Sequence, residues 1–356
     1  MAASDSPVRK RRSPSRNDPL AADHRDALQL DQALVWVVIP CYRVKAHILG
    51  VLAGIPAWVQ GVVCIDDACP EQSGDFIEAN CKDKRVHVLR LPENQGVGGA
   101  TLAGYGLALE LGAAIMVKLD GDGQMDPDNL PQLLAPILLG EADYAKGNRF
   151  TTMSHLQAMP GVRTFGNAAL SMIAKVSTGY WGVFDPTNGF TAIEASVARL
   201  IMVRAIDRRY FFETDMLYNL GSLRAVVKDV AIPARYADEE SNLRIGKILL
   251  PFAAKHLRNA ARRLIGQYFV RDLNIASIET ILGVPLLLFG LLYGLSWIHK
   301  PHVGPAPAGV VMLAALPVII GVQFLLQAVN YDVQSAPSEP IHPRLRAVER
   351  LKGGAA

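Results

Sequence analysis

An apolar run at residues 113–119 leads directly into an acidic cluster, Asp-Gly-Asp-Gly-Gln at 120–124. The run is short, rich in small and β-prone residues and without a 3.6-residue period, which predicts a buried parallel strand. The acids then lie at the carboxyl end of that strand, where open α/β sheets bind ligands. Because one glycine separates Asp120 from Asp122, both carboxylates can converge on one hard cation such as Mg²⁺ or Mn²⁺. The alternative is an acidic turn that caps a helix beginning near Pro127.

Strands alternate with helices along residues 34–245. This alternation predicts an α/β domain with a largely parallel, doubly wound sheet that has helices on both faces. Asp66 and Asp67 end the second strand, so we expect them at the same edge of the sheet as Asp120 and Asp122. The strands are predicted at 34–39, 61–65, 85–89, 113–119, 143–147 and 225–232, and the helices at about 44–54, 98–111 and 128–139.

Glycines 96, 98 and 99 lie at the start of one predicted helix. They lack a complete Gly-x-Gly-x-x-Gly and follow the third strand, so they indicate dinucleotide binding only weakly. A tight helix start beside a sugar nucleotide and a plain turn both remain open. The region 150–245 is less regular, and the polar clusters around it are typical of loops and helix ends lining a cleft, although each could be a cap or turn. These clusters are residues 146–150, Arg163 with Asn167, residues 185–190 and residues 211–215.

The C-terminal region carries the excess of apolar residues that raises the apolar share to 50% and the mean hydropathy to +0.20. Uncharged runs at 281–298 and 308–329 are each long enough to cross ~30 Å of hydrocarbon as a helix. Residues 246–272 mix apolar residues with cations at helical spacing, which is typical of helices in a membrane interface. Basic residues flank the outer ends of the hairpin, so the positive-inside rule predicts a cytoplasmic globular part. A buried core hairpin and a soluble amphipathic helix are the alternatives.

These features predict five parts, from a disordered N-terminal tail to a cytoplasmic C-terminal tail. The first 30 residues lack an apolar core, so no signal peptide is expected. A formal net charge of +3 is too small to indicate nucleic-acid binding. The four cysteines lack metal-ligand spacing and are predicted to be reduced thiols of a cytosol-facing domain. The parts are the tail at 1–33, the α/β domain at 34–245, interfacial helices at 246–272, two transmembrane helices at 273–330 and the C-terminal tail at 331–356.

Taken in order, the motifs resemble those of inverting GT-A glycosyltransferases of family 2. Within that family the chain is similar to the polyprenyl-phosphate glycosyltransferases related to dolichol-phosphate mannose synthase. The resemblance runs from about Val35 to Leu243 and continues into the apolar hairpin. No single motif is specific, but six or more in order, followed by a hairpin, are strong support. The motifs are residues 38–42, 65–67, 94–100, 120–124, 147–150, 185–190 and 239–243.

The resemblance implies that the first half of a GT-A, Rossmann-like domain binds the donor. Asp120, Asp122 and Gln124 would hold Mg²⁺ or Mn²⁺ on the donor diphosphate, and the acids at 66–67 would hold its base and ribose. Arg43-Val44 stands where the family often has Asn-Glu, which leaves base recognition open. The residues implied in donor binding are Pro40, Tyr42, Asp66, Asp67, Gly98, Asp120 and Gly121.

The resemblance places acceptor binding in the second half. Arg149, with Arg163 and Asn167, would receive the acceptor phosphate, and Asp185 would lie near the reacting centre. Arg149 and Asp185 are therefore the predicted catalytic residues. The family's late Ser-Lys-Leu motif is Ser-Asn-Leu at 241–243, which removes one expected phosphate contact.

The implied activity is inverting transfer of a sugar from a UDP- or GDP-sugar to a membrane polyprenyl phosphate, on the cytoplasmic face of what we expect to be a bacterial inner membrane. Association into a homo-oligomer stays open. One alternative is a family 2 transferase that elongates a glycan, although the Gln-x-x-Arg-Trp motif of processive synthases is absent. A second is a non-catalytic, membrane-anchored sugar-nucleotide binder. Such a binder would not need Asp120, Asp122, Arg149 and Asp185 together.

Overall fold

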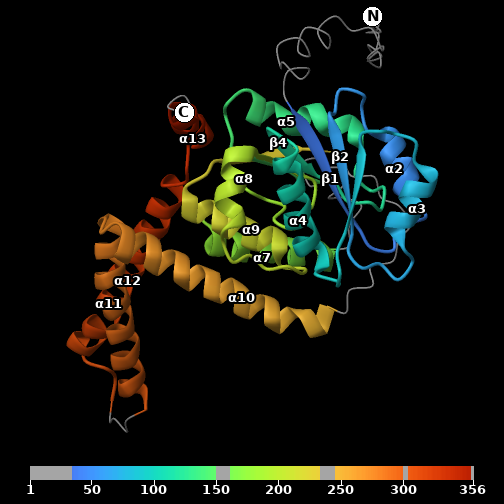
Figure 1. The fold of residues 1–356 in the computed structure, drawn as a ribbon. Coiled ribbons are helices and arrows are strands. Elements are labelled where there is room, and N and C mark those ends of the chain that lie inside the picture. The colour runs from blue at the N-terminus through green and yellow to red at the C-terminus, as the bar shows by residue number, and fades with distance from the viewer. Residues whose placement is uncertain (1–33, 150–160, 233–244, 300–303, 354–356) are drawn as a thin grey trace, which may run out of the picture.

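The computed structural model describes residues 34–149, 161–232, 245–299 and 304–353 (Figure 1). A seven-stranded sheet forms the centre of the globular part, in the order β3-β2-β1-β4-β6-β5-β7. Its strands are β1 (Val35–Cys41), β2 (Gly61–Asp66), β3 (Val86–Arg90), β4 (Ile115–Lys118), β5 (Tyr144–Asn148), β6 (Thr191–Glu194) and β7 (Val227–Ala231).

Most strand pairs in the sheet are parallel, which confirms the predicted α/β class. β1 pairs in parallel with β2 and β4, β2 with β3, and β5 with β7. β6 runs antiparallel to both β4 and β5. β6 was not predicted from the sequence; it is only four residues long and lies inside the irregular region. Because β6 reverses direction between β4 and β5, the carboxyl ends of β4 and β5 still share one edge of the sheet.

Helices cover both faces of the sheet, and alternate residues of β1 supply the two cores. Val35, Val37 and Ile39 belong to one core and Trp36 and Val38 to the other. On the first face lie α2 (Ile48–Gly54), α3 (Ser73–Asn80) and α5 (Leu130–Leu138), which follows the short 3₁₀ helix η1 (Pro127–Asn129). On the second lie α4 (Gly96–Glu110), α8 (Ala195–Met202) and α9 (Phe212–Leu223).

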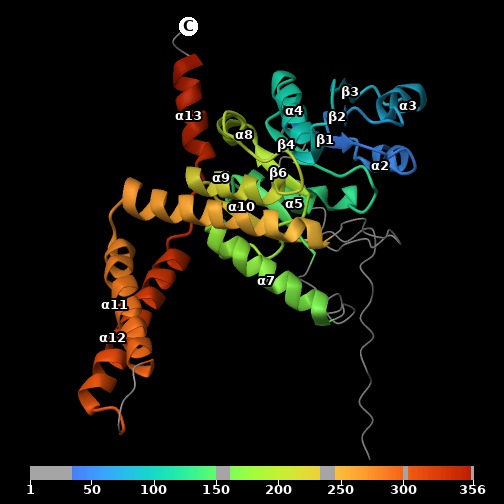
Figure 2. The same ribbon diagram turned by 90° about the horizontal axis from the view of Figure 1, so that it is seen from below.

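A group of longer helices lies outside this core. α7 (Gly161–Thr178) and α10 (Ile245–Ile265) pack against each other, and α10 continues into a π-helical turn, η2 (Gly266–Arg271). α11 (Ile275–Ile298) and α12 (Ala308–Gln334) then form a hairpin that projects away from the globular part in both views (Figures 1 and 2). By length and composition, both hairpin helices are able to cross a membrane.

Glycines allow the hairpin helices to pack closely. A Cβ added at Gly290 would lie 2.6 Å from the carbonyl oxygen of Ala314, and one added at Gly321 would lie 2.6 Å from the backbone nitrogen of Leu287. Small residues at such crossings are a common means of helix association in lipid. We expect larger side chains at either glycine to force the two helices apart.

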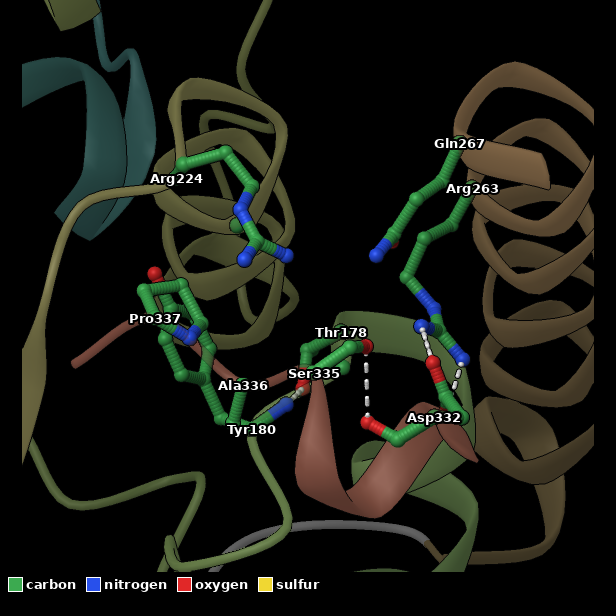
Figure 3. Close-up of a pocket in the computed structure, with 11 residues that line it drawn as sticks. Thr178, Tyr180, Arg224, Arg263, Gln267, Asp332, Ser335, Ala336 and Pro337 are labelled. Carbon is green, nitrogen blue, oxygen red and sulfur yellow. Dashed lines mark hydrogen bonds and ion pairs between the residues drawn. The ribbon is translucent and has the colours of Figure 1, made fainter. Parts of the chain in front are cut away.

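A buried ion pair joins the hairpin to the rest of the chain. Arg263 of α10 donates two hydrogen bonds to Asp332 of α12, at 2.7 and 2.9 Å, across the small polar pocket in Figure 3. The Asp332 carboxylate also accepts hydrogen bonds from the hydroxyl of Tyr268 and the indole nitrogen of Trp181. Since breaking a buried pair leaves an uncompensated charge, this cluster holds α12 firmly against α10.

The chain after the hairpin returns to the sheet. α13 (His342–Gly353) packs beside α8, and Arg346 donates to the buried carboxylate of Glu194 at 2.8 Å. The Asp143 carboxylate accepts hydrogen bonds from the backbone nitrogens of Ile341 and His342. The segment predicted only as a tail therefore contains a docked helix, which its sequence pattern did not indicate.

Candidate active site

A cavity of about 580 Å³ lies at the carboxyl ends of β1, β2 and β4. Pro40 and Tyr42 reach it from β1, Asp67 from the end of β2, and Asp120 and Asp122 from the loop after β4. The expected placement of the acids at one edge of the sheet therefore holds for these three carboxylates. The other residues that line the cavity are Cys41, Val44, Asn94, Gly96, Val97, Gly121, Arg209 and Tyr210.

The two adjacent acids at the end of β2, Asp66 and Asp67, have different surroundings. Both oxygens of Asp66 accept backbone hydrogen bonds, from Cys69 at 2.7 Å and Gly74 at 2.6 Å, so this carboxylate fixes the start of α3. Asp67 lines the cavity, and its oxygens accept from the backbone nitrogens of Gln95 and Gly96 at 2.7 and 2.8 Å. Asp67 therefore lines the cavity, whereas Asp66 is not among the residues that line it.

The glycines at the start of α4 accommodate another part of the protein. The backbone nitrogens of Gly98 and Gly99 donate to the carbonyl oxygen of Arg208, at 2.9 and 3.2 Å. Gly96 has a φ of +80°, and a Cβ there would lie 2.7 Å from the same oxygen. These glycines let the segment before α9 approach closely and carry Arg209 and Tyr210 into the cavity wall. Gly98 itself serves this packing and does not line the cavity.

A buried lysine lies beneath the acidic loop. Lys118, the last residue of β4, donates to Oδ1 of Asp120 at 2.6 Å, and its Nζ lies 3.4 Å from Glu213 of α9. Burial alone would lower the pKa of Lys118, but the carboxylates of Asp120 and Glu213 outweigh this and raise its pKa above the ordinary value. The ammonium therefore stays charged and fixes the position of Asp120.

The carboxylates at the cavity fit a divalent cation. Asp120 and Asp122 both line the cavity, and Oδ1 of Asp122 accepts from the backbone nitrogen of Gln124 at 3.0 Å. Among the described residues, no group of three or more His, Cys, Asp or Glu converges as a closed metal cage. Two carboxylates with open positions are the arrangement that Mg²⁺ uses when substrate phosphates complete its shell. The side chain of Gln124 as a third ligand stays a prediction.

The loop at 185–190 lies between this acidic loop and β5. A Cβ at Gly189 would lie 2.6 Å from Oδ2 of Asp120, and Lys118 approaches the Gly189 carbonyl oxygen at 3.4 Å. A second buried lysine, Lys146 of β5, donates to the carbonyl oxygen of Asn188. Burial lowers the pKa of Lys146 to about 8. Two lysines from different strands thus hold this loop in place.

Arg149 forms a bidentate ion pair with Asp185 just beyond β5. Its Nε and Nη2 donate to the two carboxylate oxygens at 2.8 and 3.1 Å. Asp185 is buried, whereas the guanidinium remains partly exposed. Because β5 ends at the same edge as β4, Arg149 lies on the side of the sheet that carries Asp120 and Asp122. The structure therefore joins the two residues predicted to be catalytic.

Other residues predicted at the acceptor site cannot all be placed. Arg163 and Asn167 belong to α7, four residues apart and hence on one helical face, but their side chains lie outside the described part of the structure. Phe150 and the motif at 241–243 also lie outside the described residues. Their roles stay predictions.

Comparison with known proteins identifies the family. The family model described as glycosyl transferase family 2 matches residues 36–201. The undecaprenyl-phosphate mannosyltransferase of Micrococcus luteus is 31% identical over 181 residues, which cover 50% of this chain and 72% of the relative. The chain belongs to glycosyl transferase family 2. This confirms the family inferred from the sequence motifs and makes the protein a glycosyltransferase.

Two further similarities bear on this family 2 enzyme. The UDP-N-acetylglucosamine–dolichyl-phosphate N-acetylglucosaminyltransferase of Methanococcus voltae is 27% identical over 219 residues, covering 58% of this chain and 87% of the relative. The crystal structure of glucosyl-3-phosphoglycerate synthase from Mycobacterium tuberculosis with UDP superposes with a TM-score of 0.52 at 18% identity. That match covers 66% of this chain and 84% of the other. It confirms the GT-A fold.

Several residues of the glycosyltransferase site were not predicted from the sequence. Lys118 lies in the predicted apolar run at 113–119, and Lys146 lies in the predicted strand at 143–147. Their positions in strands expected to be buried were the available signal, since a lysine is almost never fully buried without a partner. Glu213 lies in the polar cluster at 211–215, but no role was predicted for it. Nothing in the sequence indicated that Arg209 and Tyr210 line the cavity, because the glycine loop that brings them there lies far away in sequence.

Proposed function

We propose that the protein transfers a sugar from a nucleotide-diphosphate sugar to a polyprenyl phosphate in the membrane. The main support for the proposal is that an acid-lined cavity and the Arg149–Asp185 ion pair lie at the same edge of the sheet. α10 runs along the globular part from near this edge to the apolar hairpin (Figures 1 and 2). The names of the two relatives, which include undecaprenyl phosphate and dolichyl phosphate, support a lipid acceptor.

The cavity would hold the donor. Asp67 and Tyr42 line the part nearest β1 and β2, where a base and ribose would lie, and the acidic loop lies nearest β4. Asp120 and Asp122 would hold Mg²⁺ or Mn²⁺ against the diphosphate, and such a cation supplies Lewis-acid stabilisation of the leaving group. The residues of the chain itself would bind and orient the donor, and Lys118 fixes the Asp120 carboxylate.

Arg149 would receive the acceptor. A lipid monophosphate has a second pKa of about 6 and is therefore mostly dianionic at pH 7, so its oxygen needs no strong base. The phosphate oxygen attacks the anomeric carbon, the bond from that carbon to the diphosphate breaks, and the nucleoside diphosphate leaves. Attack on the face opposite the leaving group inverts the anomeric centre. A guanidinium offers the phosphate planar, bidentate hydrogen bonds, and Asp185 holds it in the required orientation.

The hairpin would anchor this reaction at the cytoplasmic face. α11 and α12 would cross the membrane, with Gly304 in the connecting loop on the far side. A cysteine placed at Gly304 should react with an impermeant reagent added outside intact cells, whereas one placed at Leu139 of the globular part should not. Labelling in the reverse pattern would reject this topology.

Incubation of the protein with radiolabelled UDP- and GDP-sugars and vesicles containing polyprenyl phosphate tests the proposal. We expect one donor to give label that extracts into organic solvent in proportion to the lipid phosphate. Label that enters only an existing glycan would instead favour an elongating transferase. Donor binding with no transfer to any lipid phosphate would favour a non-catalytic binder.

A further inference from the structure

The cavity at the carboxyl ends of β1, β2 and β4 contains a single basic side chain among the described residues that line it. Asp67, Asp120 and Asp122 are its acidic residues, and Arg209 is its basic one. Arg209 is exposed, and its hydrogen bonds are made by its backbone. In the part of the chain that the structure describes, its guanidinium forms no hydrogen bond or ion pair, so it is available to a ligand.

The segment before α9 determines where Arg209 lies in the cavity wall. On one side is Gly96, at which an added Cβ would lie 3.1 Å from Cγ of Arg209 and whose backbone nitrogen donates to Asp67. On the other side α9 begins, and its Glu213 lies 3.4 Å from the Nζ of Lys118, which holds the acidic loop. Arg209 therefore lies between Asp67 and the acidic loop.

This position corresponds to the middle of the proposed donor. If the ribose lies at Asp67 and the cation at the acidic loop, the diphosphate has to cross the part of the cavity next to Arg209. Three carboxylates repel a diphosphate, and one divalent cation does not balance all of their charge. A guanidinium reduces this repulsion and offers phosphate oxygens planar, bidentate hydrogen bonds.

A turn formed by Asp207 fixes the backbone of Arg209. Oδ1 of Asp207 accepts from the backbone nitrogen of Arg209 at 3.0 Å, which is a typical way for an aspartate to stabilise a turn. The backbone nitrogen of Asp207 donates to Asp215 of α9 at 2.8 Å. The Asp207 side chain is only 15% exposed, so its charge requires a partner.

α10 supplies that partner. Lys255 of α10 donates to Oδ2 of Asp207. Asn259, one helical turn further along α10, donates to the buried carboxylate of Asp215 at 2.7 Å. Two side chains of one helix thus hold the two aspartates that fix the turn. Since the turn carries Arg209, a change in α10 at Lys255 should be felt in the cavity.

We propose that Arg209 binds the diphosphate of the nucleotide-sugar donor and that Lys255 positions Arg209 through Asp207. Arg209 contacts the substrate, whereas Lys255 is a positioning residue that touches no ligand. The inference rests on the donor of the proposed function and is independent of the acceptor. It adds a residue from the second half of the α/β domain to a donor site that the sequence motifs placed in the first half.

Calorimetric titration of the full chain in detergent with UDP and with GDP, in the presence of Mn²⁺, tests the contact. Arg209→Gln should weaken binding of the preferred nucleotide by about tenfold, which corresponds to ~1.4 kcal/mol. Arg209→Lys should lose less affinity, because it keeps the charge and loses only the bidentate geometry. Both variants should unfold at the temperature of the parent, because the Arg209 side chain is exposed.

Arg208→Gln is the matched control. Arg208 is also exposed and is adjacent in sequence, but its guanidinium donates to Gln95 at 3.1 Å and does not line the cavity. The control removes the same charge from the same segment and should leave nucleotide affinity close to that of the parent. Equal losses for Arg208→Gln and Arg209→Gln would mean that affinity follows the net charge of the segment, and would overturn the inference.

A double-mutant cycle tests the positioning role of Lys255. Lys255→Met should weaken nucleotide binding by about threefold, and Lys255→Arg should restore most of this loss. In the Arg209→Gln chain, Lys255→Met should have no further effect, because the group that it positions is absent. Additive losses would show that Lys255 does not act through Arg209. Lys255→Gln replaces Lys255→Met in the cycle if the latter does not fold.

The outcomes separate this inference from the proposed function. Nucleotide binding that Arg209→Gln does not weaken would overturn the inference and leave the proposed transfer intact. Failure of the parent to bind either UDP or GDP would overturn both. A loss of affinity in Arg209→Gln, combined with no transfer of sugar to lipid phosphate by the parent, would support the inference and reject the proposed acceptor.

Discussion

Two ion pairs at the edge of the sheet face solvent in opposite ways. In the pair of Lys118 with Asp120, the lysine side chain is 1% exposed and the aspartate 31%. In the pair of Arg149 with Asp185, the aspartate is 1% exposed and the arginine 38%. The first pair therefore presents a carboxylate and buries its cation, whereas the second presents a cation and buries its carboxylate.

This difference supports the proposed function, in which one edge of the sheet serves two anionic substrates. The exposed carboxylate suits a cation that carries a diphosphate, and the exposed guanidinium suits a phosphate directly. In each pair the buried member orients the exposed one before any ligand arrives, which reduces the cost of organising the site. The loop at 185–190 contacts both pairs and so fixes their separation.

The largest effect is expected from removing Asp122, the second of the two carboxylates that we propose as cation ligands. Asp122→Ala should lower transfer by about 10³-fold, because the leaving diphosphate loses several kcal/mol of Lewis-acid stabilisation. EDTA should have the same effect on the parent, and Mg²⁺ or Mn²⁺ should reverse it. Initial rates of radiolabel transfer measure both. Asp128→Ala, at an exposed acid of η1, is the control and should retain activity. Full turnover of Asp122→Ala in metal-free buffer would show that transfer does not depend on a cation bound by Asp122.

The second pair can be changed without removing its charge. Arg149→Lys should reduce transfer by about 10–100-fold, because an ammonium cannot reproduce the bidentate geometry that phosphate requires. Donor affinity, measured by calorimetry on the same preparation, should stay constant. Arg199→Lys changes an exposed arginine paired with Glu349 and should have no effect. If donor affinity falls as much as the rate for Arg149→Lys, the two pairs do not serve separate substrates.

Replacement of the buried Lys118 tests its role in the ion pair with Asp120. Lys118→Met should tighten Mn²⁺ binding by about tenfold, because a unit charge that repels the metal ion disappears from the immediate neighbourhood of Asp120. Electron paramagnetic resonance titration without donor gives this affinity. Transfer should nevertheless fall, since Asp120 loses the group that orients it. Unchanged Mn²⁺ affinity would show that Lys118 does not set the charge of the cavity.

The smallest expected effect is on the pH dependence of stability, which should differ between the two buried lysines, Lys146 and Lys118. The folded-state pKa of Lys146, about 8, lies below that of an unfolded lysine, so the unfolded chain binds more protons between these values. Stability from this group therefore rises as pH increases from about 8 to about 10. Over that range the parent should gain about 1–3 kcal/mol relative to Lys146→Met. Unfolding in detergent measures the difference.

The matched lysine should behave differently. The carboxylates of Asp120 and Glu213 raise the pKa of Lys118, so its contribution is present throughout the same range and is lost only at higher pH. Lys118→Met should therefore show no gain for the parent between about pH 8 and pH 10. Identical pH profiles for the two variants would contradict the distinction between these lysines.

The donor side was largely predictable because its signals are local in sequence. Periodicity alone could order the apolar strand before Asp120 and the acids at the end of β2 along a parallel sheet. The separate positions of Asp66 and Asp67 could not, because they depend on where α3 begins and which backbone nitrogens it leaves for Asp66. A sequence shows two adjacent carboxylates and does not show which one is already satisfied.

The acceptor side was less predictable because its contacts are distant in sequence. Asp185 and Arg149 are 36 residues apart and meet only because β6 returns antiparallel between β4 and β5. The return of α13 to Asp143 depends on a contact across 199 residues. Neither contact leaves a periodic pattern in the sequence. The motifs of the acceptor side could therefore be recognised by resemblance, but the contacts between their residues could be seen only in the structure.

The structure of the lipid product decides whether the protein transfers a single sugar to polyprenyl phosphate with inversion. The lipid phase is recovered after incubation with the preferred nucleotide sugar and polyprenyl phosphate, and its phosphorus and anomeric proton are examined by nuclear magnetic resonance. We expect one sugar per lipid, joined through a phosphodiester, with the anomeric configuration opposite to that of the donor. A retained configuration, several sugars on each lipid, or sugar released only into water would contradict it.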